Sequence, residues 1–158
     1  MSKILKIKAR QVFDSRGNPT IEAEVYSKTF SASAICPSGA STGTYEAFEK
    51  RDLNNSKYLG KSVLSAVNLV NTKISKKLKG LNINDQYRID TTLINLDGTR
   101  QKMKIGANAI LAVSMAVKKL SAKIKKIPLY KNFLIKKNFS LPYPLMNIIN
   151  GGAHANNG

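Results

Sequence analysis

The chain has 158 residues and a formal net charge of +17, from 26 basic and 9 acidic side chains. This length predicts one domain, or one domain and the start of another. Because 42% of the residues are apolar, the chain can bury a core, which argues against disorder over most of its length. No stretch approaches the ~18 consecutive apolar residues of a membrane span, and the start lacks the apolar run of a signal peptide. We therefore expect a cytoplasmic protein without a membrane partner.

The basic excess has two interpretations. Positive charge would strengthen binding to a nucleic acid, because neutralised phosphates release counterions. However, 21 of the 26 basic residues are Lys, whereas nucleic-acid readers favour the planar Arg fork. Asn and Ile each occur 15 times, and their rise together with Lys is typical of drift in a compositionally biased genome. We favour drift and expect no nucleic-acid partner; a shortened, decayed protein that acts as a basic nucleic-acid or anion-binding module is the alternative.

The first part of the chain predicts a small antiparallel sheet. Alternating apolar and polar residues indicate a strand over 4–13, and the turn residues of 15–19 follow it. A second strand is predicted over 20–26 and a third from about 30 to 36. Short connections make these three strands a meander with one face that needs cover. Cys36, the only cysteine, excludes an intramolecular disulfide, and its apolar neighbours favour a small core residue over a nucleophile.

Helices are predicted to supply the cover. Apolar residues at 63, 67, 70, 74 and 78 indicate an amphipathic helix that ends at Gly80. A shorter helix follows, capped by Asn84 or Asp85, and a third runs from Gly106 to just before Pro128. We interpret the lysines of the third helix as a solvated face and as compensation of the helix dipole, rather than as a membrane surface. These lysines are Lys118, Lys119, Lys123, Lys125 and Lys126.

The pattern changes after residue 138. Residues 141–150 (LPYPLMNIIN) are typical of a Pro-led entry into a fully buried strand, and GGAHANNG completes the chain. A buried strand needs neighbours on both sides, and no further strand or helix pattern follows. The sequence therefore looks cut off, with a first domain over 1–138 and the start of a second over 139–158.

Two segments are candidates for chemistry. The loop at 37–43 (PSGASTG) combines small hydroxyl residues with glycines, so that its backbone could approach an anion or a metal; a mobile connection is the alternative. It lacks the GK[ST] ending of a phosphate-binding Walker loop. His154, the only histidine, follows the predicted strand, where barrel residues face ligands; a structural or merely exposed role is the alternative.

The acidic residues argue against some other chemistries. All 9 lie between Asp14 and Asp97, and Glu46 and Glu49 are spaced as on one helical turn. They do not converge near His154. Catalysis by two carboxylates and a metal site made only of carboxylates are therefore poorly supported.

Five segments together resemble the enolase family, the glycolytic phosphopyruvate hydratases, in the family's order and approximate spacing. They are ARQVFDSRGNPTIEAEV (9–25), PSGASTGTYEAFEKRD (37–52), LDGTRQKMKIGANAILAVSMAV (96–117), IPLYKNF (127–133) and LPYPLMNIINGGAHANNG (141–158). The resemblance implies an α+β domain of three antiparallel strands covered by about four helices. It also implies a following α/β barrel, of which only the first strand and its loop are present.

The resemblance also implies an activity. Enolases are lyases that dehydrate 2-phosphoglycerate to phosphoenolpyruvate with two Mg²⁺ ions. The family's metal carboxylates, base Lys and acid Glu lie on later barrel strands, so this chain carries no catalytic residue and should be inactive alone. Ser41 matches the serine that binds the second Mg²⁺ when the loop closes. Gly39, Ala40 and His154 match loop positions near the substrate.

Partners follow from the same resemblance. Arg10 and Glu22 match positions that pair across the family's homodimer interface, with partners in the barrel of the other subunit. Ala153 stands where many relatives carry Ser or Glu, which softens the charge of the last loop without removing its histidine.

Overall fold

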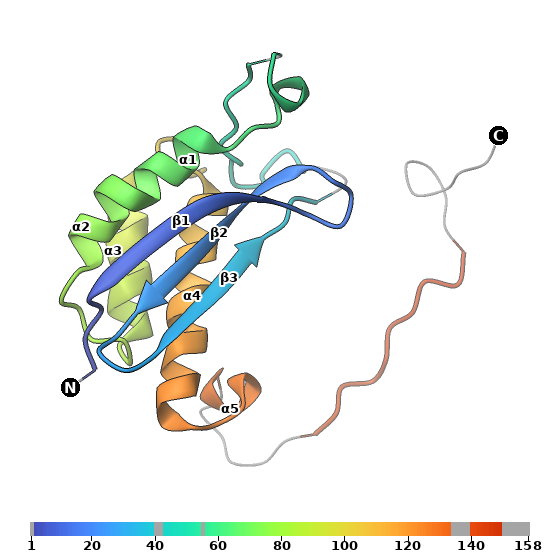
Figure 1. Ribbon diagram of the computed structural model, residues 1–158. Helices are drawn as coiled ribbons and strands as arrows, with labels where there is room; N and C mark the ends of the chain where they lie inside the picture. Colours follow the sequence, from blue (N-terminus) through green and yellow to red (C-terminus); the bar gives the residue numbers. More distant parts are fainter. Residues whose placement is uncertain (1, 40–42, 55, 134–139, 150–158) are drawn as a thin grey trace.

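The computed structural model describes residues 2–39, 43–54, 56–133 and 140–149. Its sheet has three strands in the order β1-β2-β3, and both strand pairs are antiparallel (Figure 1). The predicted meander is thereby confirmed, with bounds that differ from the expected ones by a few residues. The strands are β1 (Lys6–Phe13), β2 (Pro19–Tyr26) and β3 (Ser31–Cys36).

Helices cover one face of the sheet and leave the other face open (Figure 1). The helix α4 packs against β2 and β3, while α1 and the segment after it run along β1. The helical segments are η1 (Tyr58–Gly60), α1 (Leu64–Leu69), η2 (Val70–Ile74), α2 (Ser75–Leu78), α3 (Gln86–Asp97), α4 (Ala107–Lys125) and α5 (Leu129–Phe133).

The core lies between the sheet and α4. Ile21 and Val25 of β2, and Val117 and Leu120 of α4, have no exposed surface. Alternation on the strand and a step of three on the helix bring these residues to the same interface. Burial of each such side chain contributes on the order of 1.5–3 kcal/mol to folding. The strand and helix periodicities therefore identify the core correctly.

The predicted helix over 63–78 is not regular. It is one continuous helical run in which the α-helices α1 and α2 flank the π-helical segment η2. The extra residue in a π turn is not visible in apolar spacing, because Val70, Ile74 and Leu78 are still fully buried. Val67, expected in the core, is only partly buried.

Helix ends are set by polar side chains. The Asp85 carboxylate accepts a hydrogen bond from the N–H of Arg88 at 3.1 Å, so the predicted cap of α3 is confirmed. Gly98 ends α3 with a φ of 69°, in the left-handed region that favours glycine. Asp52, from a distant loop, accepts from the N–H groups of Leu64 and Ser65, each at 2.9 Å, at the start of α1.

Two expectations from the sequence are wrong. Residues 43–50 contain no helix, so Glu46 and Glu49 do not share a helical turn. The conformation of this segment is fixed instead by backbone hydrogen bonds to neighbouring loops. Residues 141–149, the described part of the range 141–150 that was expected to enter a buried strand, form no strand. Their side chains are exposed, with Leu145 at 100%. A strand needs backbone partners, and Figure 1 shows this segment extending away from the sheet and helices.

Candidate functional site

The structure describes only part of the predicted site. Ala40, Ser41 and His154 lie outside the described residues. Gly39 is described and exposed, three residues beyond the end of β3. What the structure does show is how the chain is attached to the domain just before the candidate loop, at Cys36, and after it, over residues 49–51.

The first attachment is at the end of β3. The Thr20 hydroxyl, on β2, donates a hydrogen bond to the Cys36 carbonyl, one residue before the loop begins. The Cys36 thiol is half-buried, and burial, with the Glu49 charge adding to it, raises its pKa to about 11. The thiol therefore stays protonated at neutral pH, in agreement with the expectation that Cys36 is not a nucleophile.

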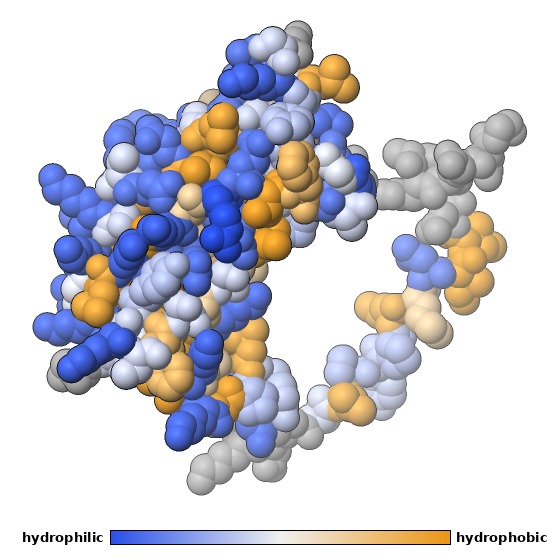
Figure 2. Space-filling model, viewed as in Figure 1, coloured by the Kyte–Doolittle hydropathy of each residue, from blue (hydrophilic) through white to orange (hydrophobic). Residues whose placement is uncertain are grey.

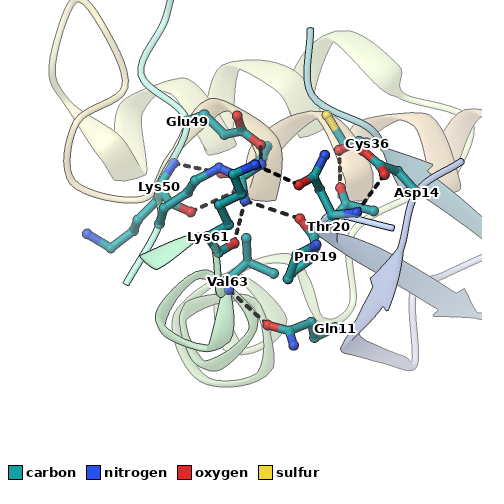
Figure 3. A network of polar contacts seen from close by, with 12 residues as sticks. Gln11, Asp14, Pro19, Thr20, Cys36, Glu49, Lys50, Lys61 and Val63 are labelled. Atoms are coloured by element: carbon teal, nitrogen blue, oxygen red, sulfur yellow. Dashed lines mark hydrogen bonds and ion pairs between the residues drawn. The ribbon is translucent and has the colours of Figure 1, made fainter. Parts of the chain in front are cut away.

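The second attachment centres on Arg51, whose partners Glu49, Pro19 and Lys61 are labelled in Figure 3. Its guanidinium pairs with the Glu49 carboxylate at 2.8 Å, donates to the Pro19 carbonyl at 3.2 Å, and donates to the carbonyl of Lys61. The Arg51 side chain is 17% exposed. One side chain therefore joins the segment that follows the loop to the start of β2 and to the entry of α1. The sequence did not predict this role, because two of its three partners are backbone carbonyls from other parts of the chain.

The third attachment joins the loop to α4. The Asn108 side chain accepts from the backbone N–H of Lys50 at 3.2 Å and donates to the carbonyl of Lys50 at 3.0 Å. Asn108 is 2% exposed. At Gly106, where φ is 98°, an added Cβ would lie 2.5 Å from the Cβ of Lys50. The Gly-Ala-Asn sequence at 106–108 therefore allows the loop backbone to approach α4 closely.

A cavity of about 520 Å³ lies beside the end of the candidate loop. One wall is the segment 44–47 and the other is the segment 99–103, which carries the Arg100 guanidinium. Asp97 shapes the second wall by accepting hydrogen bonds from the N–H groups of Thr99 at 3.0 Å and Ile105 at 2.7 Å. Burial opposes ionisation of Asp97, but these hydrogen bonds and that of the Thr99 hydroxyl outweigh it and lower its pKa.

The remaining two predicted residues, Arg10 and Glu22, are brought together on the open face of the sheet. They are cross-strand partners, and the Arg10 Nε lies 2.6 Å from a Glu22 carboxylate oxygen. The second acidic residue, Glu24, lies 3.8 Å from Arg10, and a hydrogen bond from the hydroxyl of Tyr26 lowers its pKa. Figure 2 shows this face as a mixture of hydrophilic and hydrophobic residues. Its charges form a connected group.

The described residues do not provide a metal site by themselves. Within them, no three His, Cys, Asp or Glu side chains come together in a group that could hold a metal ion. None of the helices in the described residues has the length and apolar character needed to cross a membrane.

Comparison with known proteins identifies the domain. Residues 4–133 match the family model described as enolase, N-terminal domain. The chain is 86% identical over all 158 residues to a protein named enolase from Pelagibacter ubique (strain HTCC1062). It spans 38% of the length of that relative. The matched range ends with α5 and includes all three attachments described above and the Arg10–Glu22 pair. The chain belongs to the enolase family, and its residues 4–133 form an enolase N-terminal domain.

Proposed function

We propose that this chain supplies the N-terminal part of an enzyme that dehydrates 2-phosphoglycerate to phosphoenolpyruvate. The observation that carries the proposal is the 86% identity to an enolase along the whole chain. The basic binding module is not favoured, because several lysines already serve the fold. Lys61 donates to Asn18 at 2.9 Å, and Lys119 donates to a strand carbonyl at 3.2 Å.

The role proposed for this part is to hold and close the loop over the substrate. Ser41 would be a ligand of Mg²⁺, while Gly39, Ala40 and His154 would lie near the substrate. When bound, Mg²⁺ would supply positive charge against the substrate's anionic oxygens. The chain spans 38% of its enolase relative, and we assign the rest of the ligand set to the later barrel strands of the enzyme. We retain the division into a domain over 1–138 and the start of a barrel over 139–158.

The loop attachments support a closing motion with fixed ends. Thr20 holds the residue before the loop, and Arg51 and Asn108 hold the segment 49–51 that follows it. Closure of such a loop excludes water and completes a catalytic set. Fixed ends confine the movement to the residues between them. In this proposal Arg51 and Asn108 are positioning residues, because they act through the loop.

The open face of the sheet is proposed as the dimer contact. The helices leave this face uncovered (Figure 1), and it carries the connected charges of Arg10, Glu22 and Glu24. Charged groups at an interface fix its register and select its partner more than they raise affinity. In a homodimer these residues would exchange some of their present contacts for groups of the other subunit.

The test is a chimaera in which the remainder of the Pelagibacter ubique enolase is joined after Gly158. We expect Mg²⁺-dependent formation of phosphoenolpyruvate by the chimaera and none by the chain alone. Ser41→Ala in the chimaera should lower kcat by about 10²-fold or more, the range for loss of one preorganised catalytic contact. The matched control is Ser56→Ala, in an exposed loop where the hydroxyl contacts only Asn54 among described residues.

The outcomes separate the parts of the proposal. A folded chimaera without activity would contradict the proposed reaction. An active chimaera in which Ser41→Ala and Ser56→Ala behave alike would retain the reaction but remove the role of Ser41. Turnover by the pure 158-residue chain would contradict the assignment of the chemistry to the missing part.

A further inference from the structure

A three-stranded sheet has two edges, and each edge can pair with a strand of another molecule. The outer strands β1 and β3 each have a row of backbone N–H and C=O groups that face away from β2. Such a row is a template for a strand of another molecule. The polar groups at these two edges therefore decide whether the sheet can add a fourth strand.

The edge of β1 is closed by the side chain of Asn71. Its Oδ1 accepts from the N–H of Ala9 at 2.8 Å, and its Nδ2 donates to the carbonyl of Ala9 at 3.0 Å. These are the two bonds that a residue of a neighbouring antiparallel strand would make. Asn71 lies in the π-helical segment η2, which contacts β1. The π-helical turn therefore contains the residue whose side chain makes the hydrogen bonds of a neighbouring strand.

The start of the same edge is closed by backbone. Gly80 donates to the carbonyl of Ile4 at 2.8 Å, and Ile4 donates to the carbonyl of Leu81 at 2.9 Å. Lys3 and Asn82 form an isolated bridge. The segment after α2 therefore pairs with the residues that lead into β1, and Asn71 continues this closure further along the strand.

The edge of β3 is closed by two lysines of α4. The Nζ of Lys119 donates to the carbonyl of Ser33 at 3.2 Å, and the Nζ of Lys123 donates to the carbonyl of Ser31 at 3.0 Å. Ser31 and Ser33 are two residues apart, so their carbonyls point to the same edge. The spacing of four on α4 places both lysines on one helix face. Charge also repels a second copy of so basic a chain.

We propose that Asn71, Lys119 and Lys123 guard the two edges of the sheet, so that self-association through β-strand addition is blocked. This inference concerns the 158-residue chain itself and does not depend on the proposed enzymatic reaction. It also gives two of the α4 lysines a role other than solvation or dipole compensation.

The β1 guard is tested by hydrogen exchange at the Ala9 amide. We expect Asn71→Ala to accelerate exchange of this amide about five- to tenfold in dilute protein, the ratio set by loss of one net hydrogen bond. Raising the protein concentration should restore its protection, because another strand can then pair with the open edge. The matched control, Asn68→Ala, changes an exposed asparagine of α1 and should leave Ala9 unaffected.

A second variant keeps this test decisive if Asn71→Ala does not fold. Asn71→Asp retains an oxygen that accepts from the Ala9 N–H but loses the donor to the Ala9 carbonyl, so protection of the Ala9 amide should persist. Parent-like exchange of Ala9 in folded Asn71→Ala would overturn the β1 guard. Faster exchange without restored protection at high concentration would overturn its role against strand addition.

The β3 guard is tested by sedimentation velocity. The double variant Lys119→Met/Lys123→Met removes both donors and should form concentration-dependent oligomers at protein concentrations where the parent chain does not. Lys76→Met/Lys77→Met is the control, because it removes the same charge from exposed lysines of α2. Comparison with the parent at equal concentration subtracts association through residues 140–149. Equal sedimentation of the two double variants would overturn the β3 guard.

Discussion

The helix α4 and the segment 140–149 are both rich in large apolar residues, yet their environments are opposite. Leu120 of α4 has no exposed surface, whereas Leu145 is 100% exposed and Ile148 is 90% exposed. The helix finds the sheet within this chain, and the segment contacts no comparable surface in the described residues (Figure 1). Apolar composition therefore predicts burial only where the chain also supplies the partner surface.

The sharpest test of this comparison is the same substitution at both places. Leu120→Ala should lower the free energy of unfolding by about 3 kcal/mol, because it leaves a cavity between α4 and the sheet. Leu145→Ala should change it by less than about 0.5 kcal/mol, as exposed substitutions do. Urea unfolding followed by circular dichroism measures both. Equal losses would show that residues 140–149 contribute to the stability of the domain.

The next test concerns Asp97, whose carboxylate accepts hydrogen bonds from the loop over 98–105. Asp97→Ala removes the acceptor of three hydrogen bonds, from the N–H and hydroxyl of Thr99 and the buried N–H of Ile105. We expect a loss of about 2 kcal/mol or more in the free energy of unfolding, since a buried donor is left unpaired. Asp97→Asn, which retains an acceptor, should lose less. Parent-like stability of Asp97→Ala would mean that the loop over 98–105 does not depend on this carboxylate.

The same carboxylates predict the response to acid. Hydrogen bonds outweigh burial at Asp52 and Asp97 and lower the pKa of each below its usual value of 3.8. A lowered pKa means that the unfolded state takes up protons first. The contribution to stability is therefore complete above the unfolded pKa and is lost as the pH falls through the folded pKa. Unfolding free energies measured between pH 6 and pH 3 should fall below about pH 4, and less steeply in Asp97→Asn.

Most of the domain could be predicted from sequence because its periodicities are regular. Alternation identifies Ile21 and Val25 as core residues, and helical spacing identifies Leu120. The cap at Asp85 also follows a local rule. The roles of Arg51 and Asn71 could not be predicted, because their partners are distant in sequence and are mostly backbone atoms. Every residue has a backbone carbonyl, so the sequence does not show which carbonyls accept these hydrogen bonds.

The candidate site stays a prediction: residue types pointed to the loop at 37–43 and to His154, and the resemblance assigned their roles. The loop at 37–43 has no periodicity, and Gly39 is its last described residue before 43. The structure adds the hydrogen bonds that hold the chain before and after this loop. Thr20 and Asn108 lie on the sheet and on α4, so they hold the loop from two different elements. The sequence did not indicate this arrangement, because Asn108 and Lys50 are 58 residues apart.

The smallest expected effect on stability comes from making the exposed segment polar. Leu145→Glu/Ile148→Glu should leave the Tm of the domain unchanged, because neither side chain contributes to its core. It should nevertheless raise solubility, since exposed apolar residues of an extended segment promote association. Light scattering at increasing concentration measures this, with Leu64→Glu, an exposed leucine of α1, as the control. If both variants raise solubility equally, the apolar surface of the whole molecule, rather than residues 140–149, governs association.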